Sequence, residues 1–228
     1  MVRKLNYCVA RKWSRLARSR VEEEDFAVKR FVMTALAAGV LAFPAMAALK
    51  TGATAPDFKA KASLAGKTFD FSLAAALKKG PVVVYFYPAA FTGGCNVEAH
   101  AFAESADKFA AAHATIIGVS GDSIQRLNDF SSDPQYCAGK FPVASDPEGA
   151  IGKSFNLNVM VRRPDQPAFK DSRGVLLDNK VGIERTTFVI TPDHKVAATF
   201  SSAEDKIRPN EHAEKSLALV ESMAARKH

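Results

Sequence analysis

An unbroken apolar run, VVVYFY at residues 82–87, constrains the fold of this chain more than any other segment. Its β-branched and aromatic residues favour a strand, and the absence of alternating polar residues is typical of a strand buried on both faces. Such a strand needs a layer of structure on each side. A second run of this kind, Thr115–Val119, and the helical patterns that follow both strands can supply those layers. We therefore predict an α/β fold with a central sheet flanked by helices.

The C-terminal half makes the predicted sheet mixed rather than wholly parallel. Thr186–Ile190 and Lys195–Phe200 are expected to be two strands that pair around the turn at residues 191–194. No linker or repeat divides the chain, so residues 48–228 are expected to form one domain. The remaining expected elements, in chain order, are a strand or hairpin arm at Lys67–Leu73, helices at Ser72–Lys78, Cys95–Ala112 and Ser123–Phe130, a strand at Phe141–Ser145, and helices at Pro147–Phe155 and Glu211–Arg226.

One long polar segment interrupts this pattern. Met160–Lys180 contains Pro and Gly, and we expect it to form a surface excursion from the domain. A variable loop and a substrate- or partner-binding site both fit a segment of this kind, and the sequence leaves the two interpretations open.

The positive charge of the chain is concentrated at its N-terminus. The 228 residues have a formal net charge of +7 and a pI near 9.3, which would suit binding to nucleic acid or to an anionic membrane. However, the first 47 residues carry nine of the 31 Lys and Arg side chains and four of the 24 Asp and Glu side chains. The remaining 181 residues have a net charge of only +2, so we expect no nucleic-acid partner.

Residues 28–47 have the three parts of a secretory signal peptide. Lys29 and Arg30 form a short positive region, the apolar stretch Phe31–Phe43 follows, and Ala45-Met46-Ala47 is a small-x-small cleavage site. We predict cleavage after Ala47 and a periplasmic or secreted protein. The apolar stretch of 13 residues is shorter than the about 20 that span a bilayer. This disfavours an uncleaved anchor and predicts no stable membrane insertion after cleavage.

Signal peptides begin close to the N-terminus, whereas 27 residues precede this one. We interpret residues 1–27 as a leader that results from a mis-assigned start, with translation beginning at or near Val28 or Met33. The exported protein would then lack Cys8 and would contain Cys95 and Cys137 as its two thiols. In an oxidising compartment, two thiols form either a structural disulfide or a working redox pair.

Cys95 has the sequence context of a reactive thiol. It follows the buried strand and a Gly-Gly loop, in the predicted first turn of a helix. Free backbone N–H groups and the positive end of the helix dipole stabilise a thiolate there, and the thiolate is the nucleophilic form. Thr92 places a hydroxyl three residues before the sulfur, and Pro88 closes the strand and can shield a pocket from water. An inert buried cysteine is the alternative interpretation.

These residues resemble the active-site loop of peroxiredoxins, Pro-x-x-x-Thr-x-x-Cys. Their wider pattern is similar to the peroxiredoxin Q, or bacterioferritin-comigratory-protein, subfamily of the AhpC/TSA-like proteins. This resemblance implies a thioredoxin-like fold and thiol-dependent reduction of hydrogen peroxide or organic hydroperoxides. The matching segments, which extend from about Gly52 to Met223, are APDF at 55–58, YFYP at 85–88, TGGC at 92–95 with Glu98, GVS at 118–120 with Asp122 and Ser123, Ser145-Asp146, and RTTFVI at 185–190.

The resemblance also implies roles for individual residues. Cys95 would be the peroxidatic cysteine, with Pro88, Thr92 and Arg185 as its partners. A guanidinium suits that place because it favours a thiolate and can donate hydrogen bonds to a peroxide oxygen as charge develops. Glu98, one helical turn after Cys95, either orients Arg185 or is a solvated helix acid.

A second thiol can condense with the sulfenic acid that peroxide leaves on Cys95. Many subfamily members carry this resolving cysteine five residues later, where the present chain has His100. Cys137 resembles the variant in which the resolving cysteine lies in the next helix, here after a short insertion at Ser131–Gln135. We predict a Cys95–Cys137 disulfide that forms after local unfolding. A one-cysteine mechanism with an external thiol is the alternative.

The predicted reaction needs no cofactor and no metal. The five His residues show no metal-ligand spacing with one another or with Cys, and the sequence has neither a Cys-x-x-Cys motif nor a nucleotide-binding fingerprint. The expected partners are a peroxide and a thioredoxin-like or other thiol electron donor, and the resemblance favours a monomer. Two alternative functions stay open: an exported thiol–disulfide oxidoreductase, and a redox-sensing protein of this fold without turnover.

Overall fold

Strand β3 (Val82–Phe86) lies inside the sheet that the sequence predicts, and each of its residues is buried. The computed structural model describes residues 47–163, 165, 167 and 169–226. Within them, a seven-stranded sheet has the order β2-β1-β5-β4-β3-β8-β9. The other strands of this sheet are β1 (Lys59–Leu64), β2 (Lys67–Ser72), β4 (Thr115–Ser120), β5 (Val143–Ser145), β8 (Thr186–Ile190) and β9 (Val196–Ser201).

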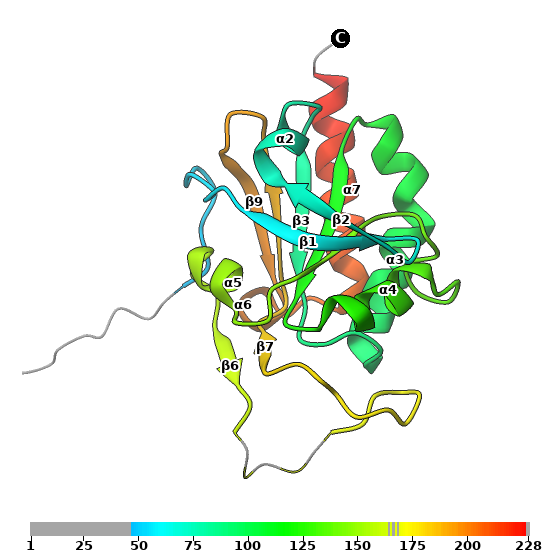
Figure 1. Ribbon diagram of the computed structural model, residues 1–228. Coiled ribbons are helices and arrows are strands. Elements are labelled where there is room, and N and C mark those ends of the chain that lie inside the picture. The colour runs from blue at the N-terminus through cyan, green and yellow to red at the C-terminus, as the bar shows by residue number, and fades with distance from the viewer. Residues whose placement is uncertain (1–46, 164, 166, 168, 227–228) are drawn as a thin grey trace, which may run out of the picture. The chain divides into compact units, whose positions relative to one another are not determined.

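The sheet is mixed, which confirms the prediction (Figure 1). β4 pairs in parallel with both β3 and β5, whereas β8 pairs antiparallel with β3 and with β9. β1 forms an antiparallel hairpin with β2 and also pairs antiparallel with β5. The predicted hairpin arm is therefore β2. Its partner β1, with the sequence KAKASL, has too weak an apolar pattern to be predicted.

The longest helices, α3 and α7, pack against each other on one side of the sheet (Figure 1). Both begin two residues earlier than predicted. Pro209 can occupy the first position of α7 because that position needs no N–H donor. The helix start is also capped, since Arg208 N donates a hydrogen bond to Glu211 Oε2 at 2.5 Å. The described helices are α2 (Leu73–Leu77), α3 (Gly93–Ala111), α4 (Ile124–Ser132), α5 (Ala150–Ser154), α6 (Ser202–Asp205) and α7 (Pro209–Ala225).

β3 sends alternate side chains to the two faces of the sheet, because successive residues of a strand point in opposite directions. Val83 and Tyr85 join an apolar cluster with residues of α3, α4 and α7, and this cluster includes both Cys95 and Cys137. The even-numbered residues of β3 join a second cluster that includes residues of α2. The two thiols therefore belong to the same apolar core.

The predicted excursion, Met160–Lys180, has paired strands at its two ends. It begins within β6 (Val159–Val161), which pairs antiparallel with β7 (Val181–Ile183) in a separate two-stranded sheet. Arg162 N then donates to the Lys180 carbonyl at 2.8 Å. The short apolar segments of this pair are too brief for a sequence pattern to identify.

The predicted leader, residues 1–27, lies outside the described residues, as does the predicted signal peptide apart from Ala47. Both therefore stay predictions. In the part of the chain that the structure describes, no helix combines the length and the hydropathy needed to cross a membrane.

Candidate active site around Cys95

Cys95 is the third residue of α3 and is almost completely buried. Thr92 caps the helix with extended backbone, and its carbonyl accepts a hydrogen bond from Asn96 N at 2.8 Å. The N–H of Cys95 is thus among the first helical donors, which have no partner within the helix. These donors and the helix dipole favour a negative charge in this first turn.

Arg185 reaches Cys95 although 90 residues separate them. It directly precedes β8, and the antiparallel pairing places the start of β8 beside the end of β3, where Thr186 lies opposite Phe86. Arg185 Nη2 donates to Cys95 Sγ at 3.2 Å, and Arg185 Nη1 pairs with Glu98 Oε2. The structure therefore brings three of the predicted site residues into direct contact.

Glu98 is not a solvated helix acid, because its side chain is completely buried. Burial raises the pKa of Glu98 to about 8, against the opposing effect of Arg185. Near neutral pH the carboxyl therefore keeps its proton in much of the protein. A protonated Glu98 leaves more of the positive charge of Arg185 to stabilise a thiolate at Cys95.

The two glycines before Cys95 have different surroundings. A Cβ atom added at Gly94 would lie 3.2 Å from Arg185 Nη2 and 3.3 Å from Pro209 Cγ, whereas a Cβ at Gly93 would meet no atom within 4 Å. Gly94 therefore makes room for the guanidinium that contacts the sulfur. The TGGC motif alone does not distinguish these two positions.

Pro88 and Thr92 lie in the loop between β3 and α3 and are half-buried. Thr92 Oγ1 donates to the Ala89 carbonyl at 2.8 Å, so its oxygen stays available as an acceptor. The Pro88 carbonyl accepts a hydrogen bond from Asn179 Nδ2 at 3.1 Å. Both residues line a pocket of about 450 Å³ whose other wall is formed by the excursion and β7.

An ionic cluster centred on the buried Asp171 attaches the excursion to this loop. Asp171 accepts hydrogen bonds from Arg126 Nη2 at 2.6 Å and from Arg173 Nη2 at 2.9 Å. Arg126 Nη2 also donates to the Ala90 carbonyl at 3.0 Å, and the Arg173 guanidinium lies 3.2 Å from the centre of the Phe91 ring. Burial would raise the pKa of Asp171, but the hydrogen bonds from Arg173 and the backbone outweigh it and lower that pKa.

Part of the excursion is therefore built into the active-site loop and is more than a variable loop. Ser172 strengthens the attachment, because its N–H and its hydroxyl both donate to the Phe91 carbonyl at 2.9 Å. The charged residues of this cluster come from α4 and from the excursion, and only folding brings them together, so no local sequence pattern predicts it.

Cys137 is completely buried, but it does not lie in a helix as the resemblance implied. α4 ends at Ser132, because Pro134 disfavours helical backbone at Asp133, and Cys137 lies in the turn that follows. Both Cys137 and Cys95 are free thiols here. Burial raises the pKa of Cys137, so in this conformation it is held as the poorly nucleophilic thiol.

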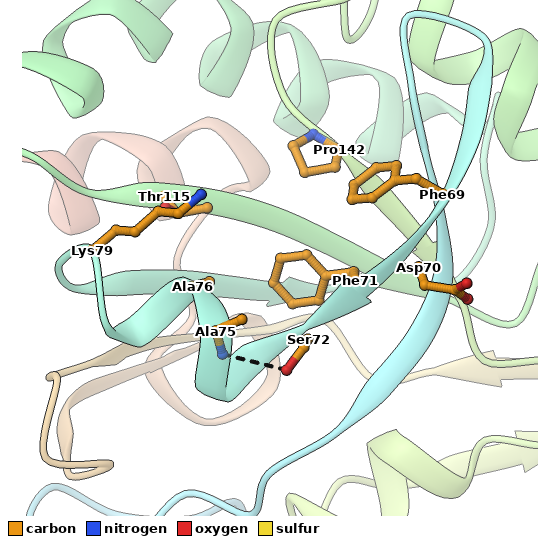
Figure 2. A pocket seen from close by; sticks show the side chains of 9 residues that line it. All are labelled: Phe69, Asp70, Phe71, Ser72, Ala75, Ala76, Lys79, Thr115 and Pro142. Atoms are coloured by element: carbon orange, nitrogen blue, oxygen red, sulfur yellow. Dashed lines mark hydrogen bonds between the residues drawn. The ribbon is translucent and has the colours of Figure 1, made fainter.

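A second hollow in the described residues lies away from the loop that follows β3. This hollow of about 270 Å³ lies between the hairpin and α2 and is bordered mainly by Phe69, Phe71 and Pro142 (Figure 2). Its lining includes no Cys or His, and we assign it no reaction. No three metal-ligating side chains gather among the described residues. The expected absence of a cofactor stays a prediction.

Comparisons with known proteins agree with this geometry. Residues 51–199 match the model of the AhpC/TSA family. The chain is 29% identical over 143 residues to peroxiredoxin Bcp of Xanthomonas campestris, covering 63% of this chain and 78% of that protein. It is also 29% identical over 172 residues to the chloroplastic peroxiredoxin Q of Sedum lineare, covering 75% and 78%.

Solved structures give the same result. Peroxidoxin BcpB from Mycobacterium tuberculosis is 32% identical, with a TM-score of 0.60 over 76% of this chain and 97% of that one. A peroxiredoxin Q structure from Xanthomonas campestris is 29% identical, with a TM-score of 0.54 over 72% and 90% of the two chains. With its thioredoxin-like fold and its cysteine at the start of a helix, the chain belongs to the AhpC/TSA family and is a peroxiredoxin, a thiol-dependent peroxidase.

Proposed function

We propose that Cys95 is the peroxidatic cysteine and that it reduces hydrogen peroxide or an organic hydroperoxide. The observation that carries this proposal is the 3.2 Å hydrogen bond from Arg185 Nη2 to Cys95 Sγ in the first turn of α3. The guanidinium and the helix dipole both favour the thiolate, which attacks one oxygen of the peroxide. The O–O bond breaks, Cys95 becomes a sulfenic acid, and the departing oxygen takes a proton to leave as water or an alcohol.

The neighbouring loop residues position the peroxide in this proposal. Thr92 Oγ1 has used its hydrogen on Ala89, so its oxygen accepts the hydrogen of the bound hydroperoxide. Pro88 limits access of water to the sulfur. Arg185 donates to the departing oxygen as negative charge develops on it.

Cys137 is proposed to resolve the sulfenic acid. Its sulfur attacks the sulfur of the oxidised Cys95, so that a disulfide and a water molecule form. Both thiols are buried, and a disulfide needs the two Cα atoms within about 7 Å. Because both thiols are buried, we propose that the turn that holds Cys137 opens for this step, which also frees its thiol from the burial that raises its pKa.

Aromatic contacts link the opening of this turn to the active-site loop. The ring of Tyr136, next to Cys137, lies 5.5 Å from the ring of Phe91, centre to centre, in an edge-on arrangement. Phe130 contacts both rings, at 5.4 Å and 4.9 Å. An opening of the turn that moves Tyr136 would therefore disturb its contacts with both of these rings.

The protein is further proposed to act in the periplasm or outside the cell, as a monomer, with a thioredoxin-like or other thiol as electron donor. The sequence of residues 28–47, which has the order of a signal peptide, supports the location, and the resemblance to the peroxiredoxin Q subfamily supports the monomer and the thiol donor. N-terminal sequencing of the exported protein is expected to begin at Ala48. A start before Val28 would refute the proposed leader and signal peptide.

Peroxide consumption with a thiol donor tests the roles of the two cysteines. Cys95→Ser is expected to abolish turnover, whereas Cys137→Ser keeps the first peroxide-dependent oxidation and loses the disulfide. After one equivalent of peroxide, mass spectrometry should detect a Cys95–Cys137 disulfide in the unmodified protein. Turnover by Cys95→Ser would refute the assignment, and insulin reduction that outpaces peroxide reduction would favour a thiol–disulfide oxidoreductase.

A further inference from the structure

His212 is a completely buried imidazole that the reaction described above does not use. It lies in the first turns of α7, and both of its ring nitrogens have hydroxyl partners. Thr187 Oγ1, from β8, lies 2.9 Å from His212 Nδ1, and Ser202 Oγ, from α6, lies 2.9 Å from His212 Nε2. Two hydroxyl groups from two separate elements thus fix the orientation of the ring.

The same imidazole faces the carboxyl group beneath the active site. His212 Nδ1 lies 3.8 Å from Glu98 Oε1. This oxygen is buried and has no hydrogen-bond partner, whereas the other oxygen of Glu98 pairs with Arg185. Burying a carboxyl oxygen without a hydrogen-bond partner costs free energy, and a polar group beside that oxygen reduces the cost. Because the His212 ring is fixed, the Glu98 carboxyl is favoured in the rotation that keeps Oε1 beside it.

We propose that His212 is a positioning residue for the peroxidase reaction: its imidazole, held by Thr187 and Ser202, fixes the carboxyl of Glu98, which in turn aims the Arg185 guanidinium at the Cys95 sulfur. His212 touches neither the sulfur nor the substrate. The inference rests on the proposed role of Cys95, because Arg185 is the group through which it acts.

The charges around the ring agree with this role. Burial and then Arg185 lower the pKa of His212 to about 4, although Asp205 and Glu211 oppose the shift. The ring is therefore neutral at pH 7, and its Nδ1, which is hydrogen-bonded to Thr187, contacts Glu98 Oε1 at 3.8 Å without a hydrogen bond. A neutral ring also adds no second positive charge beside the Arg185 guanidinium.

The test is a double-mutant cycle on the rate constant for the reaction of Cys95 with hydrogen peroxide, measured at pH 7 in the full chain. His212→Leu is expected to lower this rate constant about tenfold, the effect of about 1.4 kcal/mol on a barrier. In an Arg185→Met background the same change should have no further effect, because the group that His212 positions is gone. His212→Asn, which retains polar atoms near Nδ1, should restore most of the rate.

Two further variants separate this role from a general loosening of the fold. Val220→Ala, at a completely buried position of the same helix, should reduce stability and leave the peroxide rate unchanged. Thr187→Val, which keeps the shape of the side chain, should lower the rate two- to threefold only when Arg185 is present, and it carries the test if His212→Leu does not fold.

The inference would be overturned if His212→Leu lowered the rate by the same factor with and without the Arg185→Met change, because the two effects would then be additive. An unchanged rate in a folded His212→Leu protein would overturn it as well. A failure of the proposed function is a different result, since the unmodified protein would then show no peroxide reduction that depends on Cys95.

Discussion

Gly94→Ala offers a sensitive test of the site, because one methyl group would press on the guanidinium that contacts the sulfur. The new Cβ would lie 3.2 Å from Arg185 Nη2 and 3.3 Å from Pro209 Cγ, and ordinary contact begins near 3.4 Å. Pro209 is fixed in the first turn of α7, so the guanidinium has to move by a few tenths of an ångström. A hydrogen bond to a charged group contributes about 1.5–3 kcal/mol. The loss of roughly half of it, about 1 kcal/mol, would slow peroxide reduction about fivefold.

The matched control is Gly93→Ala, one residue earlier in the same helix, where the added Cβ meets nothing within 4 Å. Both changes replace a helical glycine, which favours stability by up to about 1 kcal/mol, and in Gly94→Ala the tight contacts with Arg185 and Pro209 offset this gain. Stopped-flow or competition kinetics with hydrogen peroxide measures the rates, and urea unfolding measures the stabilities. Equal rates for the two variants would refute the reasoning, as would a loss of rate that only follows a loss of stability.

Three further expectations concern buried charges. Arg126→Met should lower the free energy of unfolding by about 3–5 kcal/mol, because it removes the ion pair of the buried Asp122 as well as one of the two arginine partners of Asp171. Lys61→Ala, in an exposed pair, should change the free energy of unfolding by less than about 1 kcal/mol. Comparable losses in urea titrations would contradict this expectation. Burial lowers the pKa of His212 from 6.5 to about 4, so the free energy of unfolding, measured by urea titration, should decrease as the pH drops from 6.5 towards 4. The decrease should be smaller in a His212→Asn protein. Burial raises the pKa of Glu98 from 4.5 to about 8, so the free energy of unfolding should decrease as the pH rises from 4.5 to 8. If a Glu98→Gln protein showed the same decrease, Glu98 would not be its source.

Most of the sheet could be predicted because its strands carry their signal locally. The residue types alone predict a strand at the unbroken apolar run of β3 and two paired strands at β8 and β9. The reactive cysteine could be found for the same reason, since a strand, a Gly-Gly turn and a helix start occur within a few residues of it. The KAKASL strand β1 lacks such a pattern and is stabilised by the pairing it makes after folding.

The parts of the site that could not be predicted depend on contacts between distant segments. Asp171 is one charge among several in a polar stretch, and its contact with Arg126 of α4 forms only on folding. His212 has no metal-ligand spacing, and its partners come from β8, α6 and α3. The position of Cys137 depends on where α4 stops, and the boundaries of helices are harder to predict than their existence.

Because side chains alternate along β3, one face of this strand contacts the core that contains the thiols and the other face contacts a different core. Its odd-numbered residues contact the core that holds both thiols, and its even-numbered residues contact the opposite core. Replacements among the even-numbered positions can therefore tune the melting temperature with the sulfur environment left intact. Substitutions on one face of β3 therefore act mainly on thermal stability, and substitutions on the other face act on the surroundings of the two thiols.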